Sequence, residues 1–192
     1  MKEIERKWVI GSLEKDSQDN VRLLEHVKGQ SLEHHIIEQA YICNTRERDI
    51  RVRREEIYDI KDIYDHTQYD MYIKELEGVD DTLVRKEDQV SITNSTFEFA
   101  CRHRIGNIIK KERYEWTYNG LRIFVDFFKG ELDGLIMMEV EHESIHAHNN
   151  YELEDFLPTG TAYMEVTALP VFRNANLATM HTEYENNKLK LI

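Results

Sequence analysis

The chain has 192 residues, of which 41% are hydrophobic and 32% charged, and its formal net charge is −12. This length supports one domain with a substantial core, and the two prolines and eight glycines form no linker, so we expect a single domain over residues 1–192. The acidic charge argues against nucleic acid and anionic membranes as partners, and no apolar run reaches the ~20 residues of a membrane span. The charged start lacks the apolar stretch of a secretory signal, and Cys43 and Cys101 show no metal-ligand spacing, so we expect a cytoplasmic protein.

Alternation of polar and apolar residues dominates the first half of the chain. The predicted strands there are 3–10, 41–44, 50–53, 69–76 and 83–92. Between the first two of these strands, residues 13–38 form a polar stretch whose sequence is compatible with a helix. A second helix is predicted at 93–100, with Asn94 or Ser95 as its N-cap.

A hairpin signal stands out in the second half. Asn119-Gly120 separates the strand-like runs 108–118 and 121–128, and Asn-Gly between two strands is the strongest short-range hairpin signal. Further strands are predicted at 136–143 and 162–167, a helix at 151–156, and a closing helix at 174–189. About eight strands with few helices indicate a mainly β (α+β) fold, which we expect to be a closed antiparallel barrel with peripheral helices and a C-terminal helix.

Charged residues recur at every second position of several predicted strands. Residues two apart in a strand point to the same face, so Arg51 shares a face with Arg53, and Glu139 with Glu141. For any one pair, the simplest interpretation is the solvated outside of a half-buried strand. Like charges side by side on several strands are unfavourable without a ligand, however, so the accumulated pairs also fit a barrel interior. There, basic pairs would meet phosphate oxygens and acidic pairs would hold divalent cations.

Short motifs identify one family. Glu3-Ile4-Glu5-Arg6-Lys7 fits the Glu-x-Glu-x-Lys signature of the triphosphate tunnel metalloenzymes, also called the CYTH superfamily. The chain resembles the small bacterial inorganic triphosphatases of this family from end to end, because later motifs follow in the family's order. These motifs are Arg51-Val52-Arg53, Lys74, Arg85-Lys86-Glu87, Lys111-Glu112-Arg113-Tyr114, Val125-Asp126, Glu139-Val140-Glu141 and Glu165-Val166-Thr167.

The resemblance implies an eight-stranded tunnel that holds a triphosphate together with Mg²⁺ or Mn²⁺, in a site for two metal ions. The substrate-binding cations that it implies are Lys7, Arg51, Arg53, Lys74, Arg85, Lys111 and Arg113. The metal ligands that it implies are Glu3, Glu5, Asp126, Glu139, Glu141 and Glu165. For catalysis, a carboxylate such as Glu5 or Glu141 would orient the attacking water, or Lys7 would do so if its pKa were strongly lowered. Two positions depart from the family pattern, since Gln89 and Leu169 stand where acidic residues are usual.

Several functions remain open at this point. The expected reaction is hydrolysis of inorganic tripolyphosphate to pyrophosphate and phosphate, with metal-activated water inside a charged tunnel. A class IV-type adenylate cyclase is an alternative, although that branch typically has a His-Phe pair before the first motif, where only Met1-Lys2 stand here. Thiamine triphosphatase is another, and a non-catalytic triphosphate- or polyphosphate-binding protein is an alternative of a different class. The expected partner is a small-molecule triphosphate, and the oligomeric state stays open, with a homodimer among the alternatives.

Overall fold

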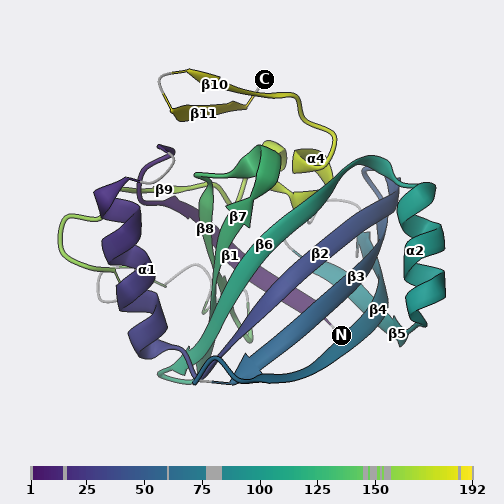
Figure 1. Ribbon diagram of the computed structural model, residues 1–192, viewed down its shortest axis with the longest axis horizontal. Coiled ribbons are helices and arrows are strands. Elements are labelled where there is room, and N and C mark those ends of the chain that lie inside the picture. The colour runs from purple at the N-terminus through teal and green to yellow at the C-terminus, as the bar shows by residue number, and fades with distance from the viewer. Residues whose placement is uncertain are drawn as a thin grey trace.

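The fold is described from a computed structural model that covers residues 2–14, 17–59, 61–76, 84–144, 147, 151, 153, 157–185 and 187–191. For residues 2, 3, 84 and 85 only the backbone is described. Nine strands form one antiparallel sheet (Figure 1). They are β1 (Lys2–Ile10), β2 (Glu33–Asn44), β3 (Arg48–Asp59), β4 (Tyr64–Leu76), β5 (Val84–Ser91), β6 (Ile105–Tyr118), β7 (Leu121–Lys129), β8 (Ile136–Glu141) and β9 (Tyr163–Glu165).

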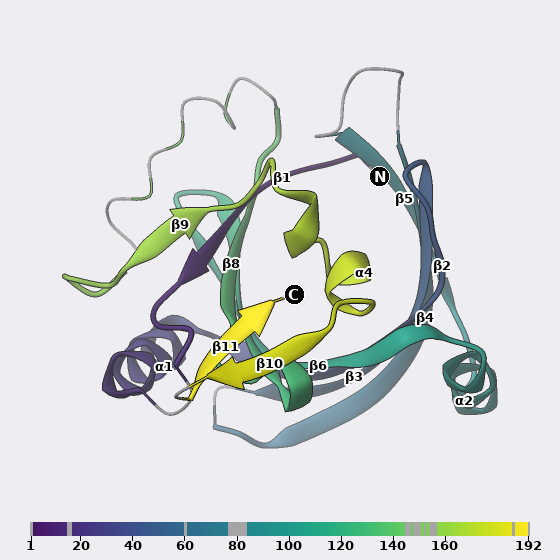
Figure 2. The same cartoon turned by 90° about the horizontal axis from the view of Figure 1, so that it is seen from above.

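The strand pairings show that the sheet curves around an interior. Neighbours run β5-β4-β3-β2-β6-β7-β8-β1-β9, and β1 also pairs with β5, with Lys2 opposite Lys86 and Ile4 opposite Val84. The N-terminal strand therefore contacts strands from both ends of this order, and Figure 2 shows the sheet bending around a central space. The predicted antiparallel sheet is confirmed, and β9 makes it one strand larger than expected.

Two helices cover the outer face of the sheet. Helix α1 (Gln18–Gln30) packs Leu23 and Val27 against Trp8, Tyr114 and other residues of the outer face. Helix α2 (Asn94–Arg102) lies on the other side of the molecule in Figure 1. It packs Phe97 and Ala100 against Ala40 and Val52. Because these outward residues alternate with charged neighbours, packing of α1 and α2 turns the charged positions of the strands inward.

The C-terminal segment covers one end of the interior. It contains η2 (Pro170–Phe172), α4 (Asn174–Leu177) and the hairpin of β10 (Thr182–Glu185) and β11 (Lys188–Leu191). Leu177 and Leu189 belong to one buried cluster with Tyr41, Phe128 and Met137 from the inner face. Figure 2 shows the hairpin and α4 over the central space of the sheet. The end of the interior that the C-terminal segment covers is therefore apolar, and the charged side chains lie farther inside.

The predicted closing helix at 174–189 is wrong beyond its first turn. Helix α4 ends at Leu177, and the chain then forms the β10–β11 hairpin. Asn187 has a φ of 64°, a left-handed conformation that no helix interior contains. Leu189 is buried between exposed Lys188 and Lys190, which is the two-residue period of a strand.

Other boundaries also shift. The helix expected within 13–38 covers only α1, because Glu33 to Glu38 belong to β2, which is much longer than the predicted strand 41–44. Thr93, rather than Asn94 or Ser95, caps α2, since its side chain accepts a hydrogen bond from the backbone N–H of Thr96. The predicted helix 151–156 lies largely outside the described residues.

The Asn119-Gly120 hairpin is confirmed. These residues join β6 to β7 with φ values of 49° and 80°, the left-handed conformations that a tight hairpin turn requires. Among the described residues, no helix has the length and apolar character needed to cross a membrane.

Candidate functional site

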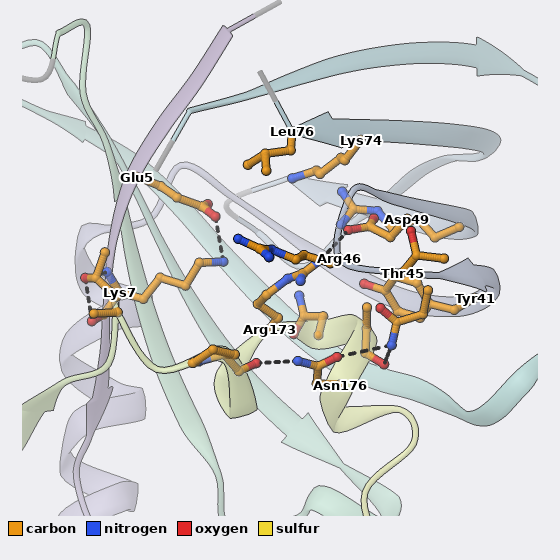
Figure 3. A pocket seen from close by; sticks show the side chains of 17 residues that line it. Glu5, Lys7, Tyr41, Thr45, Arg46, Asp49, Lys74, Leu76, Arg173 and Asn176 are labelled. Atoms are coloured by element: carbon orange, nitrogen blue, oxygen red, sulfur yellow. Dashed lines mark hydrogen bonds and ion pairs between the residues drawn. The ribbon is translucent and has the colours of Figure 1, made fainter. Parts of the chain in front are cut away.

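A charged cavity opens on the inner face of the sheet, next to the C-terminal segment. It has a volume of about 570 Å³. Its lining includes Glu5, Lys7, Tyr41, Arg51, Lys74 and Arg173. Figure 3 shows Glu5 and Lys7 reaching into this space from β1, with Arg173 and Lys74 extending toward it from other parts of the chain. Period-two alternation explains the inward direction on β1, because Arg6 and Trp8 occupy the outer face.

Buried cations gather inside the sheet. Arg51, Arg53 and Lys74 are each less than a tenth exposed, and Lys111 is 1% exposed. Burying unpaired charges costs several kcal/mol each, so these cations need anionic neighbours. Most of the predicted phosphate-binding residues therefore share one interior with carboxylates. The side chain of Arg85 lies outside the described residues.

Lys7 is held between two carboxylates. Its Nζ lies 2.8 Å from Oε1 of Glu5 and 2.8 Å from Oε1 of Glu139. Burial lowers the pKa of Lys7, but Glu139 and Glu5 outweigh burial and raise the pKa well above its ordinary value. A general base would need a lowered pKa, so this geometry favours Lys7 as a cation that binds an anion.

Asp126 anchors a second group of charges. Arg113 donates two hydrogen bonds of 2.7 Å to its carboxylate, and Lys111 Nζ lies 2.5 Å from its Oδ2. Arg113 also donates to Glu139 Oε2 at 2.9 Å, which links this group to Lys7. Burial raises the pKa of the Glu139 carboxyl, yet Lys7 and Arg113 outweigh that effect and hold the pKa well below its usual range. Burial and the nearby Arg113 lower the pKa of Lys111 to about 7, although Asp126 opposes the change.

A third group lies on β3, β4 and β5. Glu87 Oε2 lies 3.1 Å from Lys74 Nζ and 3.4 Å from the guanidinium of Arg51. The ring of Tyr72 lies under the guanidinium groups of Arg51 and Arg53, at 4.8 and 4.7 Å from its centroid. Stacking on one ring limits the positions of both guanidinium groups, so Tyr72 aligns a pair of arginines in the interior.

Some predicted site residues are not brought to this interior. Glu165 lies on the outer side of the sheet, where it bonds Arg6 and is opposite Trp8 in the strand pairing. Glu141 is directly opposite Glu5 in the pairing of β1 with β8, but its side chain is 34% exposed and contacts Arg122. The side chain of Glu3 lies outside the described residues. Among the predicted metal ligands, Glu5, Asp126, Glu139 and Glu141 therefore remain on the inner side.

The departures from the family pattern lie at exposed positions. Gln89 is exposed on β5, opposite Tyr72, and Leu169 is 44% exposed just before η2. Neither side chain is therefore buried in the interior group of charges.

The sequence missed several residues of the interior. Tyr72 and Glu87 share the inner faces of their strands with Lys74, which pairs with Glu87, so the two-residue period was a usable signal for both. Arg173, which donates to Asp49 Oδ2 at 3.0 Å, lies between η2 and α4, so its signal was the resemblance of Arg173-Asn174 to the family's last motif rather than a strand period. Only the packing of the C-terminal segment brings it to the cavity.

Comparisons with known proteins now bear on this geometry. No family model and no curated protein matches the chain. Among solved structures, the inorganic triphosphatase NE1496 is similar with a TM-score of 0.54 and 22% identity, over 92% of this chain and 94% of that chain. A conserved hypothetical protein from Pyrococcus furiosus is similar with a TM-score of 0.51 and 17% identity, over 77% of this chain and 82% of that chain. HpAC1 from Hippeastrum, for which a dominant triphosphatase activity is described, has a TM-score of 0.50 and 14% identity, over 77% of this chain and 82% of that chain.

The predicted resemblance to the triphosphate tunnel metalloenzymes is confirmed. At these identities the likeness concerns the fold alone.

The carboxylates on the inner face of the sheet fit a hard divalent cation. Glu5 and Glu141 face each other across β1 and β8, and Glu139 lies two residues from Glu141 on the same face. Carboxylate oxygens are the ligands that Mg²⁺ prefers, and Mg²⁺ needs only one or two of them when substrate phosphates and water complete its coordination. Among the described residues, no three of the predicted ligands have their oxygens within 4.8 Å of one another. The described part of the chain thus offers a cation pairs of carboxylates.

Proposed function

We propose that this protein is a metal-dependent triphosphatase that hydrolyses inorganic tripolyphosphate to pyrophosphate and phosphate. The observation that carries the proposal is the joint placement of Lys7, Arg51 and Lys74 with Glu5 around one cavity in a strongly acidic protein. Such an enclosed cluster of cations suits a small polyanion, because the net charge of −12 repels extended ones. The fold shared with the inorganic triphosphatase NE1496 supports this choice.

The substrate lies in an interior that we propose to be a closed eight-stranded tunnel. The pairing of β1 with β5 supports closure, since it joins the two ends of the series β5 to β1. A closed tunnel excludes bulk water, which strengthens every contact between a guanidinium group and a phosphate oxygen.

The cations bind and orient the phosphate chain. Arg51 and Arg53, aligned by Tyr72, present planar forks of donors to phosphate oxygens. Lys7 binds a neighbouring phosphate oxygen as a point charge and exchanges part of its contact with Glu5 and Glu139 for it. Negative charge that builds on the leaving pyrophosphate is stabilised by these fixed cations, which need no rearrangement during the reaction.

Carboxylates of the proposed tunnel would hold the divalent cation and accept a proton from the attacking water. Glu5, Glu139 and Glu141 are the residues that would hold Mg²⁺ or Mn²⁺, with Asp126 as the anchor that keeps Arg113 and Lys111 in place. A bound divalent cation supplies charge neutralisation on the phosphate and lowers the pKa of a water molecule. Glu5 or Glu141 would accept a proton from the attacking water as its oxygen bonds to the terminal phosphorus and the bridging P–O bond breaks, which releases pyrophosphate.

A non-catalytic triphosphate-binding protein is the second candidate. It is favoured by one observation, namely that the predicted acidic ligands converge in pairs rather than in a group of three within the described residues. Such a protein would bind tripolyphosphate through the same cations without turnover.

The deciding experiment measures phosphate release. Purified protein is incubated with tripolyphosphate, ATP or thiamine triphosphate, in Mg²⁺, Mn²⁺ or EDTA, beside Glu5→Gln. The matched control is Glu25→Gln on the exposed side of α1. We expect metal-dependent release from tripolyphosphate that is lost in EDTA and in Glu5→Gln and kept in the control.

Two other outcomes would overturn the proposal. If tripolyphosphate stabilises the protein but no substrate releases phosphate, the protein is a non-catalytic triphosphate-binding protein. Cyclic AMP formed from ATP, with no hydrolysis of tripolyphosphate, would make the protein an adenylate cyclase.

A further inference from the structure

A second cluster of ligand atoms lies at the end of β2 that is remote from the cavity. It consists of Glu33 and His35 on β2 and Glu115 on β6, whose ligand atoms all lie within 4.8 Å of one another. Glu33 is the first residue of β2, whereas Tyr41 further along the same strand lines the cavity. At about 3.3 Å per residue, roughly 26 Å of strand separate these two residues. The cluster therefore does not line the cavity, although Arg122 links Glu115 to Glu141.

The histidine of this cluster is buried and aimed at the carboxylates. His35 is 7% exposed, and within the described part of the chain neither ring nitrogen has a hydrogen-bond partner in acceptable geometry. Its Nε2 nevertheless lies 3.5 Å from Oε1 of Glu33, and its Nδ1 lies 3.2 Å from Oε1 of Glu55. These nitrogens are thus close to oxygens without good hydrogen bonds, which is costly for a buried polar ring. An ion between the imidazole and the carboxylates would remove that cost.

Glu55 contacts His35 at Nδ1, the ring nitrogen farther from Glu33. Gln68 donates to its Oε2 at 2.8 Å, and Arg53 lies 3.7 Å away, so this carboxylate is fixed while it faces Nδ1 of His35. A carboxylate on one ring nitrogen directs the other nitrogen toward a metal and increases its basicity. The arrangement leaves Nε2 as the ligand atom, on the side where Glu33 lies.

The two acidic members repel each other as they stand. Glu33 and Glu115 are directly opposite in the pairing of β2 with β6, and like charges opposite each other destabilise a sheet. Arg122 neutralises Glu115 in part, but the two hydrogen bonds that it donates to this carboxylate both go to Oε1, and its third goes to Glu141. The two bonds to Oε1 leave the other oxygen, Oε2, as a ligand atom for a cation.

We propose that Glu33, His35 and Glu115 form a binding site for one transition-metal ion, with Zn²⁺ as the matching ion. One imidazole nitrogen with two carboxylates suits zinc, whereas Mg²⁺ prefers oxygen ligands alone. Three protein ligands leave a fourth position for water or an exogenous ligand, since Glu33 stands at the surface with its side chain 48% exposed. The ion ties β2 to β6 at the end of the sheet opposite the cavity.

The test measures Zn²⁺ binding to the full chain by calorimetry, without triphosphate, so its result is independent of hydrolysis. We expect His35→Gln to lose one Zn²⁺ site that the parent protein has. Glu55→Gln should keep this site but weaken it by about 10–100-fold, because Glu55 acts only through His35. The matched control is His66→Gln, a histidine on the exposed part of β4, and it should retain the site. Excess Mg²⁺ should not displace the zinc.

A separate variant protects the test against misfolding. If His35→Gln does not fold, as judged by circular dichroism, Glu115→Gln replaces it and should lose the same site. Zn²⁺ binding of unchanged stoichiometry and affinity in the folded variant would overturn the proposal, as would a parent protein that binds no Zn²⁺.

Discussion

Lys7 and Glu139 face each other directly across β1 and β8, with Nζ of the lysine 2.8 Å from Oε1 of the glutamate. Glu139 also accepts from Arg113 at 2.9 Å, so one carboxylate links the cation nearest the cavity to the buried Asp126 group. The negative charge of Glu139 therefore compensates these cations, and in the proposed triphosphatase it would also offer oxygens to a divalent ion.

Replacing Glu139 by Gln separates these two roles. The amide keeps the size of the side chain but loses its charge, so we expect hydrolysis of tripolyphosphate to fall by at least about a hundredfold, as for the loss of one electrostatic group in an active site. Binding of tripolyphosphate in EDTA should persist or strengthen, because Lys7 and Arg113 are then less neutralised. Steady-state kinetics and calorimetry measure the two effects, and undiminished hydrolysis would contradict the role of Glu139.

Glu165 provides the opposite prediction. The sequence motif places it among the metal ligands, but its carboxylate bonds Arg6 on the outer side and is 42% exposed. We therefore expect Glu165→Gln to retain hydrolysis at close to the parental rate and to retain its response to Mg²⁺ concentration. An Mg²⁺ titration of activity checks this. A rate as low as that of Glu139→Gln would mean that Glu165 is a metal ligand after all.

These two glutamates show what the sequence predicts and what it leaves open. Alternation in β3 and β6 predicted the inward direction of Arg51 and Arg113, because a strand has a fixed period and α1 and α2 cover the other face. Which carboxylate meets which cation depends on strand order and register, as in the pairing of Lys7 with Glu139 across strands far apart in the chain. No local pattern contains that information.

The missed elements have a similar physical cause. Four of the six residues from Glu33 to Glu38 are polar and two of these are histidines, so the strand character of the segment comes from pairing with β3 and β6 on both sides. The β10–β11 hairpin depends on a single buried leucine and on a left-handed Asn187, neither of which makes a strong pattern. Tertiary packing determines the secondary structure of such segments more than the intrinsic conformational preference of their residues does.

Leu189 tests whether this hairpin belongs to the folded core. It is 3% exposed and packs in the apolar cluster at the end of the interior, so Leu189→Ala should lower the free energy of unfolding by about 2–5 kcal/mol. Leu169→Ala is the control. Leu169 is 44% exposed, so this substitution should lower the free energy of unfolding far less. Urea denaturation compares both with the parent. Equal effects of the two substitutions would mean that the hairpin does not cover the interior.

Tripolyphosphate should stabilise the protein, since the interior concentrates like charges that a polyanion relieves. At a ligand concentration about 100 times Kd, a ligand that binds only the folded state adds about 2.7 kcal/mol to the free energy of unfolding. Arg53→Met should reduce this increment, because Arg53 is 9% exposed and its Nε has no hydrogen-bond partner among the described residues. Arg22→Met, on the exposed side of α1, is the control. Thermal unfolding with and without tripolyphosphate in EDTA measures the increment, and equal increments in both variants would exclude Arg53 as a binding residue.

Glu55 predicts a specific contribution to acid unfolding. Burial raises the pKa of this carboxyl, but the close contact with His35 at 3.2 Å, the charge of Arg53 and the hydrogen bond from Gln68 outweigh burial and lower the pKa well below its usual range. A carboxyl whose pKa is lower in the folded state stabilises the fold above its unfolded pKa of about 4.3, and this contribution is lost as the pH falls below that value. The neutral amide of Glu55→Gln lacks the contribution at every pH.

The stability gap between the parent and Glu55→Gln should therefore be full at pH 7 and should shrink as the pH falls below about 4.3. Urea denaturation at a series of pH values in EDTA measures the gap without any contribution from bound metal. Glu25→Gln, which removes an exposed carboxylate from α1, controls for the change in net charge. A gap that stays constant or widens toward low pH would mean that the contacts of Glu55 with His35, Arg53 and Gln68 do not favour its charged form.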